Sequence, residues 1–287
     1  MPSEKRARQR ALRAQKQAII QRQRKRRTTL RRFVYGIVLV VVIVGIVVLI
    51  QTSGGGKKKA ASTTTNSTTT TSTYPVPSTL PLTTKAVVPA CPPAAGSSVR
   101  VVWFTKAPPD CVGKTSVWDA TFETSLGNFV VQMDAAKSYA AVNNFVFLAG
   151  WQYYNGTFFH RVIPGFVVQG GDPTGLGSGG PHQFPGYSYT GNTPPQSCIK
   201  DPVGPDCYKI GDIAAANTGK ATSNGSQFFV VIPGGQTTLN TEPNYTDFGK
   251  VISGLSIVEK IGADGTAGGT PKVKVYLLKV TAKQIKA

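Results

Sequence analysis

The stretch FFHRVIPGFVVQGGD, residues 158–172, decides the fold that we expect for this chain. Its first six residues, 158–163, are aromatic, β-branched or tolerated in strands, and they predict a strand. Pro164-Gly165 then predicts a turn. A second apolar run, 166–169, predicts another short strand that ends at Gly170-Gly171. The stretch therefore predicts two strands joined by a tight turn.

One charged residue, Arg161, lies within the first of these strands. Alternation along a strand puts Phe159, Arg161 and Ile163 on one face. Charged side chains are rarely buried without a partner, so this position indicates an arginine with a partner or a task. An arginine at a strand edge, extended into solvent or held in a salt bridge, is the structural alternative.

Further motifs follow this stretch in order. Residues 224–232, NGSQFFVVI, predict a turn and a strand in which Gln227 and Phe229 share a face. Residues 248–251, FGKV, predict the start of another strand. Together with AAAN at 214–217, these motifs resemble those of the cyclophilin family of peptidyl-prolyl cis-trans isomerases.

The folded part is expected to be mainly β. The cyclophilin resemblance covers roughly residues 119–282 and implies a closed eight-stranded antiparallel β-barrel capped by two helices. Many short strands without a βαβ rhythm favour the same closed antiparallel barrel. The expected elements are a hairpin that turns at 126–128, helices at 137–149 and 256–262, and strands at 210–216, 226–232 and 272–281.

The resemblance also implies which residues carry the reaction. Arg161, in its FHR context, matches the catalytic arginine of the family. The apolar cup for a proline ring matches Phe166, Val167, Phe229 and Leu239. Positions that match contacts to the rest of the substrate are Gln169, Ala216, Asn217, Gln227 and Tyr245. From the residues alone, core packing is the alternative role of Phe166 and Phe229. The resemblance implies no cofactor.

Three positions depart from the family pattern. Val167 stands where the family has Met, and Thr238 where many members have Trp. Tyr245 stands where a His often precedes the FGKV strand. Because Arg161 and Gln169 are retained, isomerase activity is expected, whereas strong cyclosporin binding is not implied without the indole.

The charge of the chain is concentrated at its N-terminus. Of the formal net charge of +19, residues 1–32 carry +12, residues 33–98 carry +4 and residues 99–287 carry +3. A basic chain often indicates a nucleic-acid partner, but the expected folded domain, 99–287, is close to balanced. We therefore expect no nucleic-acid partner. A nuclear signal or a nucleic-acid arm is the alternative for residues 1–32.

Residues 33–50 are 18 consecutive residues without a charge, a length at which a helix spans a bilayer. The positive-inside rule puts residues 1–32 in the cytoplasm as a basic tail, with anionic inner-leaflet lipids as its suitable partner, and the isomerase domain outside. A cleaved signal peptide is the alternative, although residues 49–52 form a poor cleavage site. The expected localisation is the cell membrane, single-pass, as in a bacterial membrane-anchored cyclophilin.

Residues 51–98 are expected to form a disordered linker. Between Ser62 and Thr84, 15 of 23 residues are Ser or Thr, with interleaved prolines. Such a segment buries too little apolar surface to offset the entropy cost of ordering the chain. A linker of this composition gives the domain reach.

The four cysteines, Cys91, Cys111, Cys198 and Cys207, lie beyond the apolar segment, and an even number there favours disulfides. Three pairings are open. Cys198 with Cys207 is favoured because both lie in QSCIKDPVGPDC, and Cys91 with Cys111 would then restrain the segment before the barrel. The spacings do not match a zinc site, and the chain has only two histidines, so no metal is expected.

The sequence thus predicts a peptidyl-prolyl isomerase at the outer face of the cell membrane. Its expected substrates are X–Pro bonds of secreted or envelope proteins, and its expected partners are proline-containing polypeptides. A cyclophilin-like module that binds such polypeptides with little turnover is the alternative.

Overall fold

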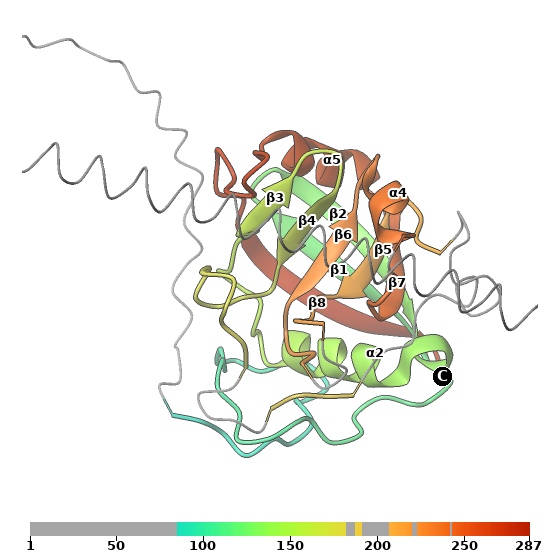
Figure 1. Ribbon diagram of the computed structural model, residues 1–287. Coiled ribbons are helices and arrows are strands. Elements are labelled where there is room, and N and C mark those ends of the chain that lie inside the picture. The colour runs from blue at the N-terminus through green and yellow to red at the C-terminus, as the bar shows by residue number, and fades with distance from the viewer. Residues whose placement is uncertain (1–84, 182–186, 191–206, 220–222, 242) are drawn as a thin grey trace, which may run out of the picture. The chain divides into compact units, whose positions relative to one another are not determined.

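Eight strands form one antiparallel sheet in the computed structural model, which describes residues 85–181, 187–190, 207–219, 223–241 and 243–287 (Figure 1). In chain order they are β1 (Val117–Thr124), β2 (Gly127–Asp134), β3 (Arg161–Ile163), β4 (Val167–Gly170), β5 (Asp212–Ala215), β6 (Phe228–Val231), β7 (Asp247–Ser253) and β8 (Leu277–Lys286). Their order across the sheet is β3-β4-β6-β5-β7-β2-β1-β8. The predicted mainly β, antiparallel fold is confirmed.

The predicted closed barrel is wrong, because β3 and β8 are the two edges of an open, curled sheet. The loop after the last helix covers the free edge of β3: Val162 N–H donates to Gly269 O at 2.7 Å, and Thr266 N–H donates to Val162 O at 3.2 Å. The edges meet only before β3, where Phe158 and Tyr276 form an isolated antiparallel bridge. Because this loop occupies the edge of β3 that β4 leaves free, β8 does not pair with β3 there.

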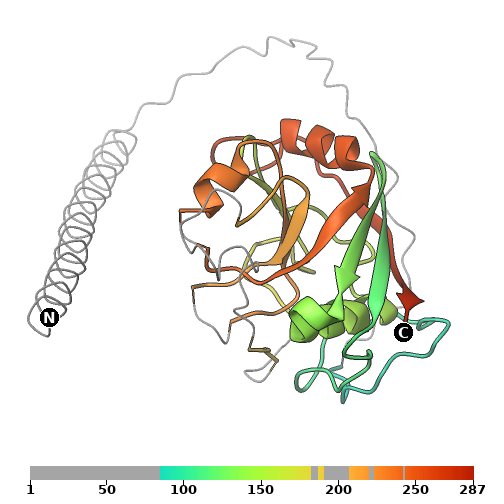
Figure 2. The ribbon, with the colours of Figure 1, turned by 90° about the vertical axis from the view of Figure 1, so that its right-hand side faces the viewer.

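Three helices accompany the sheet: α2 (Ala135–Gly150), α4 (Gly235–Leu239) and α5 (Leu255–Ala263). The helices α2 and α5 lie where the sequence predicts them, at opposite ends of the curled sheet (Figures 1 and 2). Asp134 caps α2 by accepting a hydrogen bond from Ala136 N–H at 3.0 Å. The short helix α4 was not expected, because one turn carries no periodic signal.

Alternation along β4, β5 and β6 divides their side chains between two apolar clusters on the two faces of the sheet. Residues of the first set, Val168, Ile213, Ala215, Phe228 and Val230, belong to the main core. The second set, Val167, Ala214, Phe229 and Val231, forms a smaller cluster with Cys207, Tyr208 and Leu239. Because both faces are buried, these strands are continuously apolar in sequence.

The segment before β1 packs around α2, at the bottom of Figure 1. Ser97 N–H donates to Gly150 O at 2.9 Å, and the indole N–H of Trp151 donates to Ala90 O at 3.0 Å. Residues 85–98, part of the predicted linker, therefore contact the domain, and a boundary between residues 98 and 99 stays a prediction.

A disulfide joins Cys91 to Cys111, with 5.4 Å between the two Cα atoms, so this predicted pair is confirmed. Cys207 is also disulfide-bonded. Its predicted partner, Cys198, lies outside the described residues, and that pairing stays a prediction.

The segments predicted as a basic tail (1–32) and a transmembrane helix (33–50) lie outside the described residues, as does most of the predicted linker. Within the described part of the chain, every helix is too short or too polar to cross a membrane.

Candidate active site

The candidate site is a row of side chains that crosses four neighbouring strands. The strand register places Arg161 of β3 opposite Gln169 of β4, Gln169 opposite Phe229 of β6, and Phe229 opposite Ala214 of β5. Residues in direct register on one face lie close enough for their side chains to interact. The same face of the sheet carries the smaller apolar cluster, so the row places a cation and an amide beside an apolar surface.

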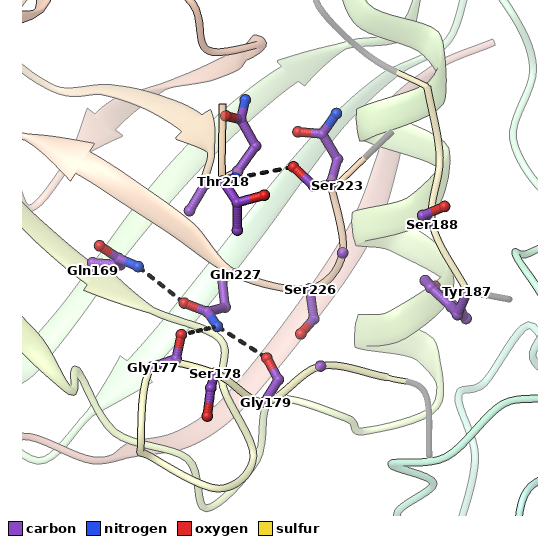
Figure 3. Close-up of a pocket in the computed structure, with 15 residues that line it drawn as sticks. Gln169, Gly177, Ser178, Gly179, Tyr187, Ser188, Thr218, Ser223, Ser226 and Gln227 are labelled. Carbon is purple, nitrogen blue, oxygen red and sulfur yellow. Dashed lines mark hydrogen bonds between the residues drawn. The ribbon is translucent and has the colours of Figure 1, made fainter. Parts of the chain in front are cut away.

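This row opens into a cavity of about 400 Å³. Its lining residues are Arg161, Phe166, Val167, Gln169, Ala216, Asn217, Phe229, Leu239 and Tyr245. Gln227, the one remaining predicted contact, lines a second cavity of about 490 Å³ that shares Gln169, Ala216 and Asn217 with the first (Figure 3). Residues from widely separated parts of the chain, predicted to act together, therefore lie together.

The floor of the first cavity is apolar. Val167, Phe229 and Leu239 are 2%, 4% and 3% exposed, so they pack in the smaller cluster and also line the cavity. The Phe229 ring meets the Tyr245 ring edge to face at 5.0 Å between centroids. For Phe229, core packing and a role in the cup are thus not exclusive.

Arg161 is half-buried at the edge of this floor. Its Nη1 donates to Gln169 Oε1 at 3.1 Å, and its Cζ lies 5.7 Å from the centroid of the Phe166 ring. Within the described residues no carboxylate lies at salt-bridge distance from the guanidinium. The salt-bridge alternative therefore has no partner among these residues, and the remaining N–H groups of Arg161 are available to a ligand.

The sequence placed Phe159 on the same face as Arg161, and this is wrong. Phe159 is 1% exposed in the main core beside Val162, whereas Arg161 and Ile163 are only half-buried. The regular strand begins only at Arg161, so the alternation cannot be extended back to Phe159.

Two glutamines, Gln169 and Gln227, connect Arg161 to a glycine-rich loop. Figure 3 shows the part of this connection that runs from Gln169 through Gln227 to the loop. Gln169 Nε2 donates to Gln227 Oε1 at 2.9 Å. Gln227 Nε2 in turn donates to Gly177 O and Gly179 O, each at 2.9 Å. The amide orientations are therefore fixed along the whole path from the loop to the guanidinium.

Sequence reasoning gave none of the residues of this loop, 172–180, a part in the site, although its glycines were a signal. Gly171 precedes it with φ +85, and a Cβ there would come within 2.4 Å of Ser226 O, so only glycine fits. Asp172 begins the loop and is 0% exposed. A buried carboxylate after a Gly-Gly turn indicates a side chain that accepts backbone N–H groups.

Tyr208, which sequence reasoning also missed, binds the backbone of Tyr245. Its hydroxyl donates to Tyr245 O at 2.6 Å and accepts from Tyr245 N–H at 2.9 Å. Tyr208 lies just after residues 191–206, which the structure does not describe, and a lone tyrosine there gave no signal.

The electrostatics near the site involve two carboxyl groups behind Tyr245. Burial and the neighbouring Asp212 raise the pKa of Asp247 to about 7. Its Oδ1 is buried and accepts no hydrogen bond. Burial also raises the pKa of Asp212, despite hydrogen bonds from Lys209 N–H at 2.7 Å and Lys250 Nζ at 3.4 Å.

Burial lowers the pKa of His160. Both ring nitrogens of His160 are buried and make no hydrogen bond within the described residues, so the structure gives this side chain no bond in the row.

Comparisons with known proteins agree with this geometry. The family model described as "Cyclophilin type peptidyl-prolyl cis-trans isomerase/CLD" matches residues 120–282. Peptidyl-prolyl cis-trans isomerase-like 1 of Emericella nidulans is 37% identical over 146 residues, which cover 50% of this chain and 81% of that protein. Peptidyl-prolyl cis-trans isomerase ppi1 of Schizosaccharomyces pombe is 37% identical over 142 residues, 49% of this chain and 82% of that protein.

Among solved structures, a cyclophilin-type isomerase of Cryptosporidium parvum aligns with a TM-score of 0.49 at 26% identity, over 58% of this chain and 98% of that chain.

These findings overturn the predicted localisation at the cell membrane, and with it the bacterial membrane-anchored form and the lipid partners. Relatives of this chain include isomerases and isomerase-like proteins of fungi, plants and animals. Within the described residues no helix could span a bilayer, and the segment 33–50 that carried the prediction lies outside them.

Proposed function

Because the chain belongs to the cyclophilin-type peptidyl-prolyl cis-trans isomerase family, we propose that the cavity beside Arg161 holds an X–Pro segment and that Arg161 drives rotation about its amide bond. The observation that supports this proposal is the in-register row in which Arg161, Gln169 and Phe229 adjoin one cavity. The predicted restriction to secreted or envelope proteins depended on the corrected localisation, and it is not proposed.

The reaction needs no nucleophile and no net proton transfer. Amide resonance keeps the peptide bond planar with a barrier of about 18–20 kcal/mol, and exchange at an X–Pro bond takes roughly tens to hundreds of seconds. A turnover of about 10² per second requires an acceleration of roughly 10⁴-fold, or about 5–6 kcal/mol. The protein must therefore stabilise the twisted amide over the planar one.

Arg161 is suited to that discrimination. Twisting the amide breaks resonance and leaves a lone pair on the proline nitrogen, which the planar amide does not offer. A guanidinium N–H aimed at this nitrogen therefore binds the transition state more strongly than the ground state. With Nη1 directed to Gln169 Oε1, other donors of Arg161 are available for this bond.

A single charge-assisted hydrogen bond contributes about 1.5–3 kcal/mol, less than the reaction needs. The remainder is assigned to the apolar floor formed by Val167, Phe229 and Leu239, which would hold the proline ring still and exclude water. Asn217, Gln227 and the backbone of Ala216 would restrain the peptide on either side, so that rotation occurs about one bond.

The test is a protease-coupled isomerisation assay on an X–Pro peptide with the full chain and its Arg161→Ala variant. We expect the variant to lose at least about ten-fold in kcat/KM, equivalent to about 1.4 kcal/mol, with an unchanged circular dichroism spectrum. A well-folded variant with the wild-type rate would remove Arg161 from this role. Peptide binding without turnover by the wild-type chain would favour the alternative of a binding module.

A further inference from the structure

Asp172, the first residue of the 172–180 loop, is a buried carboxylate outside the row. Its carboxylate is 0% exposed and lines neither of the two cavities described above. Oδ1 accepts hydrogen bonds from Thr174 N–H at 2.7 Å and Thr174 Oγ1 at 2.8 Å. Oδ2 accepts from Gly177 N–H at 2.7 Å and Gly179 N–H at 2.9 Å.

These bonds keep the carboxylate ionised. Burial alone would raise the pKa of Asp172, but the hydrogen bonds from Gly179, Thr174 and Gly177 outweigh burial and hold the pKa below its usual value. An ionised carboxylate only accepts hydrogen bonds, so all of these N–H and O–H groups must point towards it. Asp172 therefore fixes the loop and the direction of its peptide groups.

The loop then dictates the orientation of Gln227. The carbonyl oxygens of Gly177 and Gly179 can only accept, and both accept from Gln227 Nε2 (Figure 3). The amide therefore presents Oε1, and not N–H, to Gln169.

The orientation of the Gln227 amide determines that of Gln169, which contacts Arg161. Its Nε2 donates to Gln227 Oε1, so its own Oε1 faces the guanidinium, which only donates. If Gln227 were turned over, Gln169 would turn an N–H towards Arg161, and donor would face donor. The polarity of the whole relay is thus set at the loop.

We propose that Asp172 is a positioning residue for the isomerase reaction: through the Gly177–Gly179 loop it sets the polarity of the Gln227–Gln169 relay that aims Arg161. This inference rests on the proposed function, in which Arg161 acts on the twisted amide.

The first experiment measures kcat and KM of the full chain and of Asp172→Asn on an X–Pro peptide. Asparagine has nearly the same size, but in either orientation its NH₂ would face at least one of the backbone N–H groups of Thr174, Gly177 and Gly179, so the loop loses part of its anchor. We expect kcat to fall about three- to ten-fold with KM changed less than about two-fold. Asp119→Asn is the matched control, because it removes a carboxylate whose hydrogen-bond partner among the described residues is Gln132, on the β1–β2 hairpin.

The deciding readout is a double-mutant cycle with Arg161→Ala. If Asp172 acts through Arg161, Asp172→Asn should cost less than about 1.5-fold in the Arg161→Ala background. An equal loss in both backgrounds, a loss confined to KM, or a folded Asp172→Asn with wild-type kcat would each overturn the proposal.

If Asp172→Asn does not fold, Thr174→Val decides instead. It removes one of the four hydrogen bonds at the carboxylate and keeps the shape of the side chain. It should give a smaller loss of kcat that again disappears without Arg161, and the same loss in both backgrounds would overturn the proposal. The proposed function fails separately, when the wild-type chain is inactive or Arg161→Ala is fully active.

Discussion

At the scale of single residues, the geometry of Arg161 indicates that its proposed role needs the several N–H donors of a guanidinium and not only a positive charge. The side chain donates to Gln169 and still has N–H groups on the cavity side. Lysine would keep the charge, but its single ammonium cannot bond the amide in a fixed fork. We expect Arg161→Lys to lose roughly ten-fold in kcat/KM, measured beside Arg161→Ala. Near wild-type activity of the lysine variant would show that charge suffices.

Asp247 predicts a pH dependence of stability. Its pKa is about 7 in the folded protein, above its value in the unfolded chain, so the folded state binds the extra proton. The stabilisation is fully present below about pH 4 and is lost as the pH rises through 7. The advantage of Asp247→Asn over wild type should therefore grow by about 1–3 kcal/mol between pH 4 and 8.

Urea unfolding at the two pH values measures this difference, with Glu259→Gln, an exposed carboxylate on α5, as the control. An advantage of Asp247→Asn that is equal at pH 4 and pH 8 would contradict the prediction.

Single residues of the site were predictable where side-chain type and motif spacing carry the signal. Arg161, Gln169 and Phe229 were predicted to act together, and they adjoin one cavity. Asp172 and Tyr208 were not identified, because they act through hydrogen bonds to backbone groups that no periodicity reveals. Phe159 was misplaced because the chain becomes a regular strand only after it.

At the scale of elements, the segment before β1 depends on its disulfide. Cys91 and Cys111 are separated by 20 positions, and the described loop that they close contains no helix or strand. In the chain-entropy model, a loop of this size stabilises the folded state by about 2–4 kcal/mol. We expect Cys91→Ser with Cys111→Ser to lower the free energy of unfolding by that order, measured in guanidinium chloride.

The same double variant should keep its kcat/KM, because neither cysteine lines either cavity of the site. Unchanged stability would mean that the remaining contacts, such as Ser97 N–H to Gly150 O, hold the segment without the disulfide.

The elements themselves were predictable in kind and less so in extent. The helices α2 and α5 and the strands β5 and β6 lie where their patterns indicated, while β8 extends over residues 277–286 and not 272–281, and β3 is half as long as expected. Strand length depends on partners distant in sequence, and here the partner of the free edge of β3 is a loop. For the same reason the sequence could not distinguish a closed barrel from a curled open sheet.

At the scale of the whole molecule, the site and both apolar clusters lie within residues 85–287. We therefore expect a chain of residues 85–287 to fold and to retain kcat/KM within about two-fold of the full chain on a short peptide. The measurement is the isomerisation assay on both chains at equal concentration. A large loss in the shorter chain would assign residues 1–84 a part in the reaction.

The distribution of charge along the whole chain can be read from the sequence. The localisation of the protein could not be predicted from this distribution. A dense basic tail followed by an apolar run suits a membrane anchor, but these residues lie outside the described structure. The family match, which concerns residues 120–282, bears on the domain alone.

The two-sided burial of β4, β5 and β6 has a consequence for how the protein tolerates change. Neighbouring positions such as Phe228 and Phe229 are under different constraints. Phe228 belongs to the main core, and Phe229 belongs to the smaller cluster at the cavity. In a saturation library selected separately for abundance and for turnover, sensitivity along these strands should alternate with a period of two. Adaptation to a new substrate could then proceed at every second position while the intervening residues keep the scaffold intact.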